Sequence, residues 1–65
     1  MKIELNGETR AIASTTVDAA LAELGFKDAA VATALNGEFL PAPAREAQKL
    51  QEGDRLEVLA PMQGG

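Results

Sequence analysis

The sequence predicts an α+β domain in which one helix lies across one face of a mixed β-sheet. Apolar and polar residues alternate near both ends of the chain, in residues 1–5 and 55–60, as in strands that bury one face. Between them, residues 17–24 carry apolar side chains at helical spacing. Because so short a helix depends on packing, we expect it to cover the sheet that the strands form.

The composition limits the chemistry that this chain can perform. Its 65 residues suffice for one domain, 1–65, with residues 62–65 as a tail, and such a domain buries only about 60% of its unfolded surface. It has no cysteine, histidine, tryptophan or tyrosine. This excludes disulfides and thiol nucleophiles, and it removes the commonest general base and metal ligand. We therefore expect neither an enzyme nor a metal site.

The charge balance bears on partners and location. Ten acidic residues against six basic ones give a net charge of -4, which argues against nucleic acid and anionic membranes as partners and favours a basic protein surface. The first residues lack the apolar stretch of a signal peptide, and the longest small or apolar run, 29–35, is too short to span a bilayer. We expect a cytoplasmic protein.

The first strand, residues 1–5, turns at Asn6-Gly7, a strong hairpin signal. A return strand is expected over 8–13, with Ile12 as its apolar anchor. Thr15 or Thr16 can cap the following helix, and Thr15 with Asp18 resembles a capping box. The helix then shows one amphipathic stripe, formed by Val17, Ala20, Leu21 and Leu24.

The helix is expected to end at Gly25 in the left-handed conformation, with Phe26 folding back onto Leu21. Residues 29–35 are predicted to form the most buried strand. One of its faces carries Val31, Thr33 and Leu35, and the other carries only alanine, which allows close approach of another layer or simply reflects the abundance of alanine.

A second Asn-Gly turn at 36–37 leads to a short strand at 38–40, which two prolines end. Residues 44–50 are expected to form a short helix or 3₁₀ turn with Leu50 inward. In the final strand, 55–60, alternation points Leu56, Val58 and Ala60 inward and Leu59 outward. This long strand follows a crossover, so we expect it inside the sheet beside the first strand.

The last residues offer a distinct chemistry. Gly64 and Gly65 follow Pro61, Met62 and Gln63. Two glycines make a thin thread that can enter a channel too narrow for side chains, and Gly65 presents a terminal carboxylate. Taken alone, such an end is also common in chains whose termini are merely frayed.

Several segments together resemble the ThiS family, the small sulfur carriers of thiamine biosynthesis with a ubiquitin-like β-grasp fold. The resemblance covers the whole chain, and only the alanine-rich residues 42–49 match loosely. The matching segments are Asn6-Gly7, Thr15-Thr16-Val17, Leu21 with Leu24-Gly25, Ala34-Leu35-Asn36-Gly37-Glu38-Phe39-Leu40-Pro41, Leu50-Gln51-Glu52-Gly53-Asp54-Arg55-Leu56-Glu57-Val58, and Pro61-Met62-Gln63-Gly64-Gly65.

The resemblance implies a carrier rather than a catalyst. An adenylyltransferase related to the ubiquitin-activating enzymes would adenylate Gly65, a sulfur donor protein would displace AMP to leave a thiocarboxylate, and a thiazole synthase would take the sulfur. Met62, Gln63 and Gly64 would thread the partner sites. The chain lacks the G-x-x-x-x-G-K-[ST] loop that binds phosphates, so we expect no cofactor on this chain and ATP on the activating partner.

The family also uses the sheet face on which Leu59 is expected, so Leu59 and Glu57 are candidate docking residues. An isolated surface leucine is the simpler interpretation. Other functions stay open at this point: the small subunit of molybdopterin synthase, a modifier that forms isopeptide bonds, or an interaction domain without a reactive end. For a carrier that is handed between enzymes, we expect a monomer.

Overall fold

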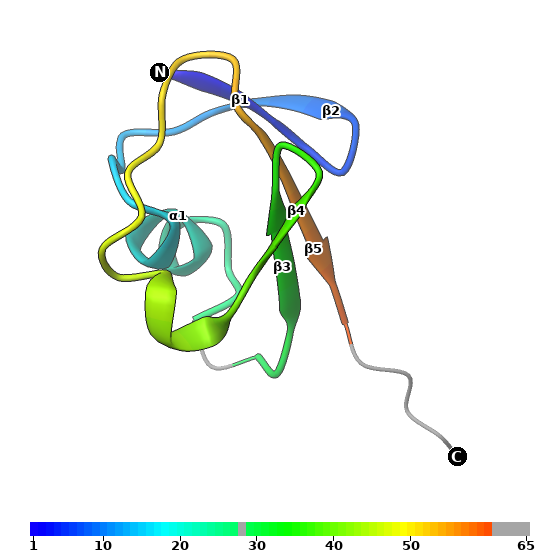
Figure 1. The fold of residues 1–65 in the computed structure, drawn as a ribbon. Helices are drawn as coiled ribbons and strands as arrows, with labels where there is room; N and C mark the ends of the chain where they lie inside the picture. Colours follow the sequence, from blue (N-terminus) through cyan, green and yellow to red (C-terminus); the bar gives the residue numbers. More distant parts are fainter. Residues whose placement is uncertain (28, 61–65) are drawn as a thin grey trace.

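The computed structural model describes residues 1–27 and 29–60, in which two strands, a helix and two strands precede a 3₁₀ helix and a last strand (Figure 1). This order confirms the predicted α+β class. The elements are β1 (Lys2–Leu5), β2 (Glu8–Ala11), α1 (Val17–Glu23), β3 (Ala32–Leu35), β4 (Glu38–Leu40), η1 (Ala42–Ala44) and β5 (Arg55–Leu59).

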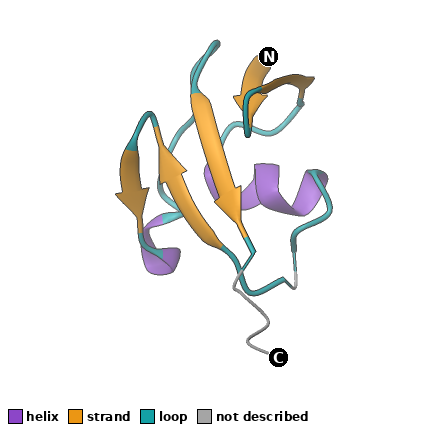
Figure 2. Cartoon of the chain, turned by 90° about the vertical axis from the view of Figure 1, so that its right-hand side faces the viewer, coloured by secondary structure: helices purple, strands orange, loops and turns teal. Residues whose placement is uncertain are grey.

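The strands form one five-stranded mixed sheet in the order β2-β1-β5-β3-β4. β5 runs parallel to β1 and antiparallel to β3, and the two hairpins β1–β2 and β3–β4 supply the edges. Figure 2 shows α1 behind the sheet, so that one face is covered and the other is open. The expected position of the final strand, inside the sheet beside the first, is confirmed.

The core fills the space between α1 and the sheet. Leu56 of β5 and Val17 of α1 are fully buried, and Ile3 of β1 is 1% exposed. The expected inward positions of Ile12 and Leu50 are confirmed. The buried apolar residues are Ile3, Leu5, Ile12, Val17, Ala20, Leu21, Leu40, Leu50, Leu56 and Val58.

The prediction that the segment 29–35 forms the most buried strand was wrong, because β1 and β5 each bury two residues. β3 begins only at Ala32, because the preceding residues are still turning away from the helix, with the Ala29 amide donating to the Phe26 carbonyl at 3.1 Å. Within β3 only Thr33 is buried. The strand ends also differ from expectation: β2 stops at Ala11, and Ala60 lies beyond β5 and is exposed rather than inward.

Both ends of α1 use the local chemistry that the sequence indicates. Thr16 is the N-cap, and its hydroxyl accepts a hydrogen bond from the Ala19 amide at 3.3 Å. The third helical position is therefore Ala19, so the expected capping box between Thr15 and Asp18 is wrong. At the other end, Gly25 has a φ of +96°.

The Schellman motif predicted at the end of α1 is confirmed. The amide of Phe26 donates to the Leu21 carbonyl at 2.7 Å, and the amide of Gly25 donates to the Ala22 carbonyl at 3.2 Å. Phe26 is half-buried and packs against the core that includes Leu21. These bonds satisfy the carbonyls of Leu21 and Ala22 at the end of the helix.

The 3₁₀ helix occupies Ala42–Ala44 rather than residues 44–50, where a helix or 3₁₀ turn was expected. The segment that follows is irregular and satisfies the first amides of α1. The Val17 amide donates to the Gln48 carbonyl at 2.9 Å, and the Asp18 amide donates to the Arg45 carbonyl at 3.1 Å. These carbonyls take the place of further capping side chains.

Arg45 joins this irregular segment to β3. Its Nε donates to Thr33 Oγ1 at 2.9 Å, and its Nη2 donates to the Val31 carbonyl at 2.6 Å. The Thr33 hydroxyl in turn donates to the Leu40 carbonyl at 2.8 Å. The buried hydroxyl of Thr33 is therefore satisfied both as donor and as acceptor. Nothing in the described ranges is a helix of sufficient length and apolarity to cross a membrane.

Candidate functional site

The open face of the sheet carries two large apolar side chains, Phe39 of β4 and Leu59 of β5, which are 73% and 64% exposed. Ala34 lies opposite Phe39, and Ala32 lies opposite Leu59. Directly opposed residues share a sheet face, so these four side chains form one apolar surface. We call Phe39, Ala34, Ala32 and Leu59 the outer patch. Because the alanine side chains are short, the outer patch is shallow between Phe39 and Leu59 and open to a partner.

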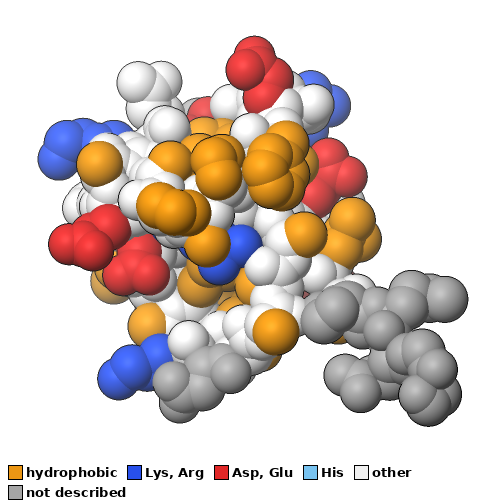
Figure 3. Space-filling view, turned by 60° about the horizontal axis from the view of Figure 1, so that its bottom comes forward, with side chains coloured by type: hydrophobic (Ala, Val, Ile, Leu, Met, Phe, Trp, Pro, Cys, Tyr) orange, Lys and Arg blue, Asp and Glu red, His pale blue; other side chains and the backbone are white. Residues whose placement is uncertain are grey.

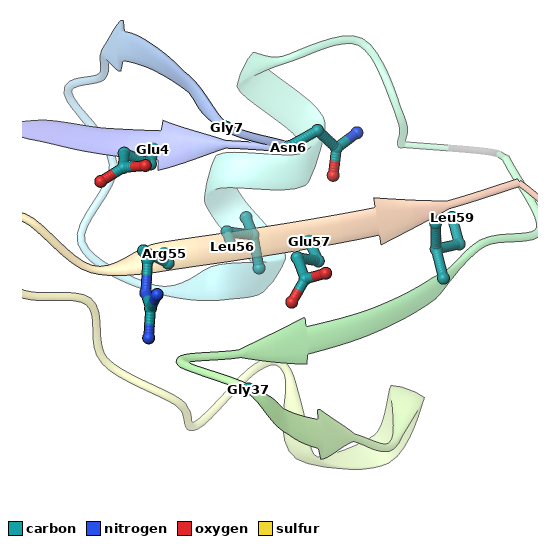
Figure 4. Close-up of a pocket in the computed structure, with 8 residues that line it drawn as sticks. All are labelled: Glu4, Asn6, Gly7, Gly37, Arg55, Leu56, Glu57 and Leu59. Carbon is teal, nitrogen blue, oxygen red and sulfur yellow. The ribbon is translucent and has the colours of Figure 1, made fainter.

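Charged side chains border the outer patch along β5. Figure 4 shows Arg55, Glu57 and Leu59 on one side of the strand, with Leu56 on the other. Glu57 lies opposite Ala34, and Glu4 of β1 lies opposite Arg55. The outer face thus changes from charged at the start of β5 to apolar at its end.

Two hollows meet at Leu59. One, of about 690 Å³, runs along the open face from Glu4 to Glu57 and Leu59 (Figure 4). The other, of about 370 Å³, is lined by Ala30, Val31, Ala32, Leu59 and Ala60. The second hollow is lined only by apolar residue types and lies where β5 ends. Figure 3 looks towards this end of the molecule, where apolar side chains gather in the middle and acidic ones lie at the margins.

The asparagines of both hairpin turns hold β5 from either side. Asn6 Oδ1 accepts from the Val58 amide at 2.8 Å, and its Nδ2 donates to the Val58 carbonyl at 3.1 Å. Asn36 Oδ1 accepts from the Arg55 amide at 2.9 Å, and its Nδ2 donates to Asp54 Oδ1 at 3.2 Å. Sequence reasoning assigned both residues to turns alone. The contacts to β5 come from residues 19 and 52 positions apart, and no local pattern reveals them.

The predicted site residues divide into two groups. Gly65, Gly64, Gln63 and Met62 lie outside the described residues. Leu59 and Glu57 are exposed on the open face, as the alternation of β5 indicates. Phe39 was not singled out, although the alternation in β4, with Leu40 buried, would have placed it outward. The docking role of Leu59 and Glu57 stays a prediction.

One carboxylate away from the open face has a perturbed pKa. Glu23, near the end of α1, accepts hydrogen bonds from the Ser14 hydroxyl at 2.7 Å and from the amides of Ala13 and Ser14. These bonds, the Ser14 hydroxyl first, lower the pKa of Glu23 from its ordinary value of 4.5. They tie the end of the first hairpin to the helix. Over residues 1–27 and 29–60, no cluster of three or more carboxylates could hold a metal ion.

Comparison with known proteins adds relatives of this chain. A family model described as the ThiS family matches residues 3–65. A protein of Thermus thermophilus named sulfur carrier protein ThiS is 39% identical over 61 residues, which cover 94% of this chain and 95% of that protein. A thiazole synthase of Paramagnetospirillum magneticum is 41% identical over 66 residues and all of this chain. The chain spans only about a fifth (20%) of that synthase.

Two solved structures resemble the fold along the whole chain. The crystal structure of a thiamine biosynthesis protein (ThiS) from Geobacter metallireducens superposes with a TM-score of 0.85 at 32% identity, and the match covers 100% of both chains. A solution structure of a thiamine biosynthesis protein from the same organism gives a TM-score of 0.79 at 30% identity. That match covers 100% of this chain and 88% of the other.

Proposed function

Because the chain belongs to the ThiS family, we propose that it is a sulfur carrier of thiamine biosynthesis that holds sulfur on the carboxylate of Gly65. The β-grasp fold expected from the sequence is confirmed by the mixed sheet with one helix and by its ThiS neighbours. The observation that carries the proposal is the extent of the family match, which runs from residue 3 to Gly65 and so includes the tail.

The chemistry needs only the terminal carboxylate from this chain. A carboxylate is a poor electrophile, so one of its oxygens first attacks the α-phosphorus of ATP on an activating partner and pyrophosphate leaves. A donated sulfide equivalent then attacks the carbonyl carbon of the acyl-adenylate, the bond to AMP breaks, and a thiocarboxylate remains. Lacking cysteine and histidine is no obstacle, since the partners supply the catalytic groups. Residues 1–65 act in this scheme as one carrier domain.

We propose three kinds of partner: an adenylyltransferase related to the ubiquitin-activating enzymes, a sulfur donor protein, and a thiazole synthase that takes the sulfur. The relative named thiazole synthase supports the last of these, because a stretch like this whole chain makes up a fifth of it. We place docking on the outer patch and Glu57, next to the base of the tail. Exposed apolar surface with a polar border is typical of protein interaction sites. Met62, Gln63 and Gly64 then enter the partner's narrow channel.

Intact mass spectrometry tests the reactive end. The chain is incubated with its activating enzyme, ATP and a sulfur donor, and we expect a mass gain equal to the exchange of one oxygen for one sulfur. Gly65→Ala adds a methyl group where the channel admits only backbone, so we expect thiocarboxylate formation to slow by about tenfold or more. Circular dichroism confirms that the variant is folded.

Two outcomes would count against this proposal. The first is an unchanged mass of the natural chain when the same enzyme thiolates another carrier in a parallel reaction. The second is a normal rate for Gly65→Ala, which would show that the activating site accepts a side chain at the last residue and so contradict the narrow channel. Deletion of Gly65 serves as the control in which the mass gain disappears.

A further inference from the structure

We propose that Asn6 is a positioning residue for the carrier reaction: its side chain fixes the end of β5 and thereby the direction in which the tail leaves the sheet. The inference rests on the proposed function, because it concerns delivery of the Gly65 carboxylate. It starts from an asymmetry in how the two edges of β5 are held. One edge is paired with a strand to its end, whereas the other depends on a single side chain.

The pairing registers locate this asymmetry. Towards β3, β5 is paired as far as its last residue, Leu59, which lies opposite Ala32. Towards β1, the register ends where Leu5 meets Leu56, and the Asn6 amide donates to the Leu56 carbonyl at 3.0 Å. Beyond that point the Asn6 side chain, rather than strand backbone, forms hydrogen bonds with the Val58 amide and carbonyl. Its carboxamide therefore occupies the place of the next peptide group in a neighbouring strand.

Small changes in direction at this point matter because the reactive atom is distant. Residues 61–65 can reach about 16 Å when extended. If a partner's channel holds the thread extended, a turn of about 10° at its base displaces its end by about 3 Å. Misplacement of reacting groups by about 1 Å can already lower a rate by up to about a hundredfold. A side chain that restrains Val58, three residues before Pro61, therefore influences how often the carboxylate is presented correctly.

The second hairpin supplies a matched control. Asn36 has the same φ of 51° as Asn6, and the glycines that follow them have φ values of 86° and 84°. Asn36 also accepts a hydrogen bond from a β5 amide, that of Arg55. That contact lies at the start of β5, at the far end from the tail. Removal of either carboxamide costs the fold two hydrogen bonds, part-buried for Asn6 and exposed for Asn36, but only Asn6 acts at the end that leads to Gly65.

The test compares Asn6→Gly with Asn36→Gly. Glycine keeps the positive φ of each turn and removes the carboxamide. Initial rates of thiocarboxylate formation at varied carrier concentration give kcat and KM for the activating enzyme. We expect both variants to lose about 4–8 °C of unfolding temperature. Only Asn6→Gly should lower kcat, by about tenfold, with KM unchanged.

Two further measurements separate positioning from general loosening. Hydrogen exchange of the Val58 amide should be faster in Asn6→Gly and unchanged in Asn36→Gly. Asn6→Asp keeps an oxygen that accepts from the Val58 amide but cannot donate to the Val58 carbonyl, so it should recover part of the lost kcat. Assays are run below the unfolding transition of every variant, as checked by circular dichroism.

The possible failures are distinguishable. If the natural chain forms no thiocarboxylate, the proposed function fails and this inference falls with it. If the natural chain reacts and Asn6→Gly matches Asn36→Gly in kcat, the positioning role alone is overturned. A rise in KM without a change in kcat would also overturn it, since that result assigns Asn6 to docking.

Discussion

The two faces of the sheet are formed by alternate residues of the same strands, but they differ in exposure to solvent. On the covered face, Leu56 and Val58 of β5 are 0% and 5% exposed. On the open face, Leu59 of the same strand and Phe39 of β4 remain 64% and 73% exposed. Burial of one such side chain is worth about 1.5–3 kcal/mol, and the open face forgoes that gain in the free chain.

The comparison shows that β5 buries alternate residues and exposes the others, and the docking role that we propose uses the exposed ones. Side chains of β5 that face α1 hold the strand in the core, and Leu59, the last of those that face outward, lies at the end of the strand that leads to the tail. Because the period of a strand is two residues, a slip by one residue would exchange the two sets. The contacts of Asn6 and Asn36 with the β5 backbone add further restraint on its register.

The largest expected effect is loss of stability on the covered face. Leu56→Ala removes fully buried methyl groups and leaves a cavity between α1 and the sheet, so we expect a loss of about 2–5 kcal/mol in the free energy of unfolding. Urea titration followed by circular dichroism measures it. The control, Leu59→Ala, should stay within about 0.5 kcal/mol of the natural chain. Similar losses for the two variants would contradict the division between the faces.

The next effect concerns binding by the open face. Leu59→Ala and Phe39→Ala each remove an exposed apolar side chain, so we expect binding to the activating enzyme to weaken by about tenfold while stability is unchanged. Isothermal titration calorimetry gives the affinities. Glu46→Ala, an exposed residue of the loop after η1, is the control and should bind normally. Natural affinity in both patch variants would exclude the outer patch as the docking surface.

Local patterns were enough to predict most of the fold. The alternation in residues 55–60 identified Leu56 and Val58 as buried and Leu59 as exposed, and Gly25 marked the end of the helix. The exact ends of the strands depend on how the strands pair in the folded chain, which local patterns do not show. β3 is shorter than 29–35 because the chain must first turn away from the helix, and that turn leaves no mark in the hydrophobic spacing.

Side chains that contact distant backbone were beyond the reach of sequence reasoning. Arg45 lies in the alanine-rich segment that matched the family loosely, yet it donates to Thr33 and to the Val31 carbonyl. The sequence identifies Asn6 only as a turn residue. Its contact with the Val58 backbone arises because β5 lies alongside it in the fold. For the candidate site, the sequence named Leu59 and Glu57 but not Phe39, whose place in the outer patch depends on the pairing of β4 with β3.

The smallest expected effect is on how stability depends on pH. It is tested with one carboxylate at the edge of the covered side, Glu23, and one on the open face, Glu57. The ionised form of Glu23 accepts hydrogen bonds from Ser14 and Ala13, which lower its pKa in the folded chain. Its contribution to stability is therefore complete above its ordinary pKa of 4.5 and is lost as the pH falls through the lower folded value. Glu23→Gln should be less stable than the natural chain at neutral pH, and the difference should shrink as the pH falls below 4.5.

Urea titrations from pH 7 to pH 3 measure this difference, and other carboxylates cancel because they are shared by both chains. Glu57→Gln is the matched control on the open face, where the Glu57 side chain is exposed. A constant gap between Glu23→Gln and the natural chain at all pH values would show that the carboxylate contributes through packing rather than charge. A gap that closes in acid would instead show that the charge of Glu23 contributes to the fold, and an unchanged stability of Glu57→Gln at every pH would show that charge on the open face does not.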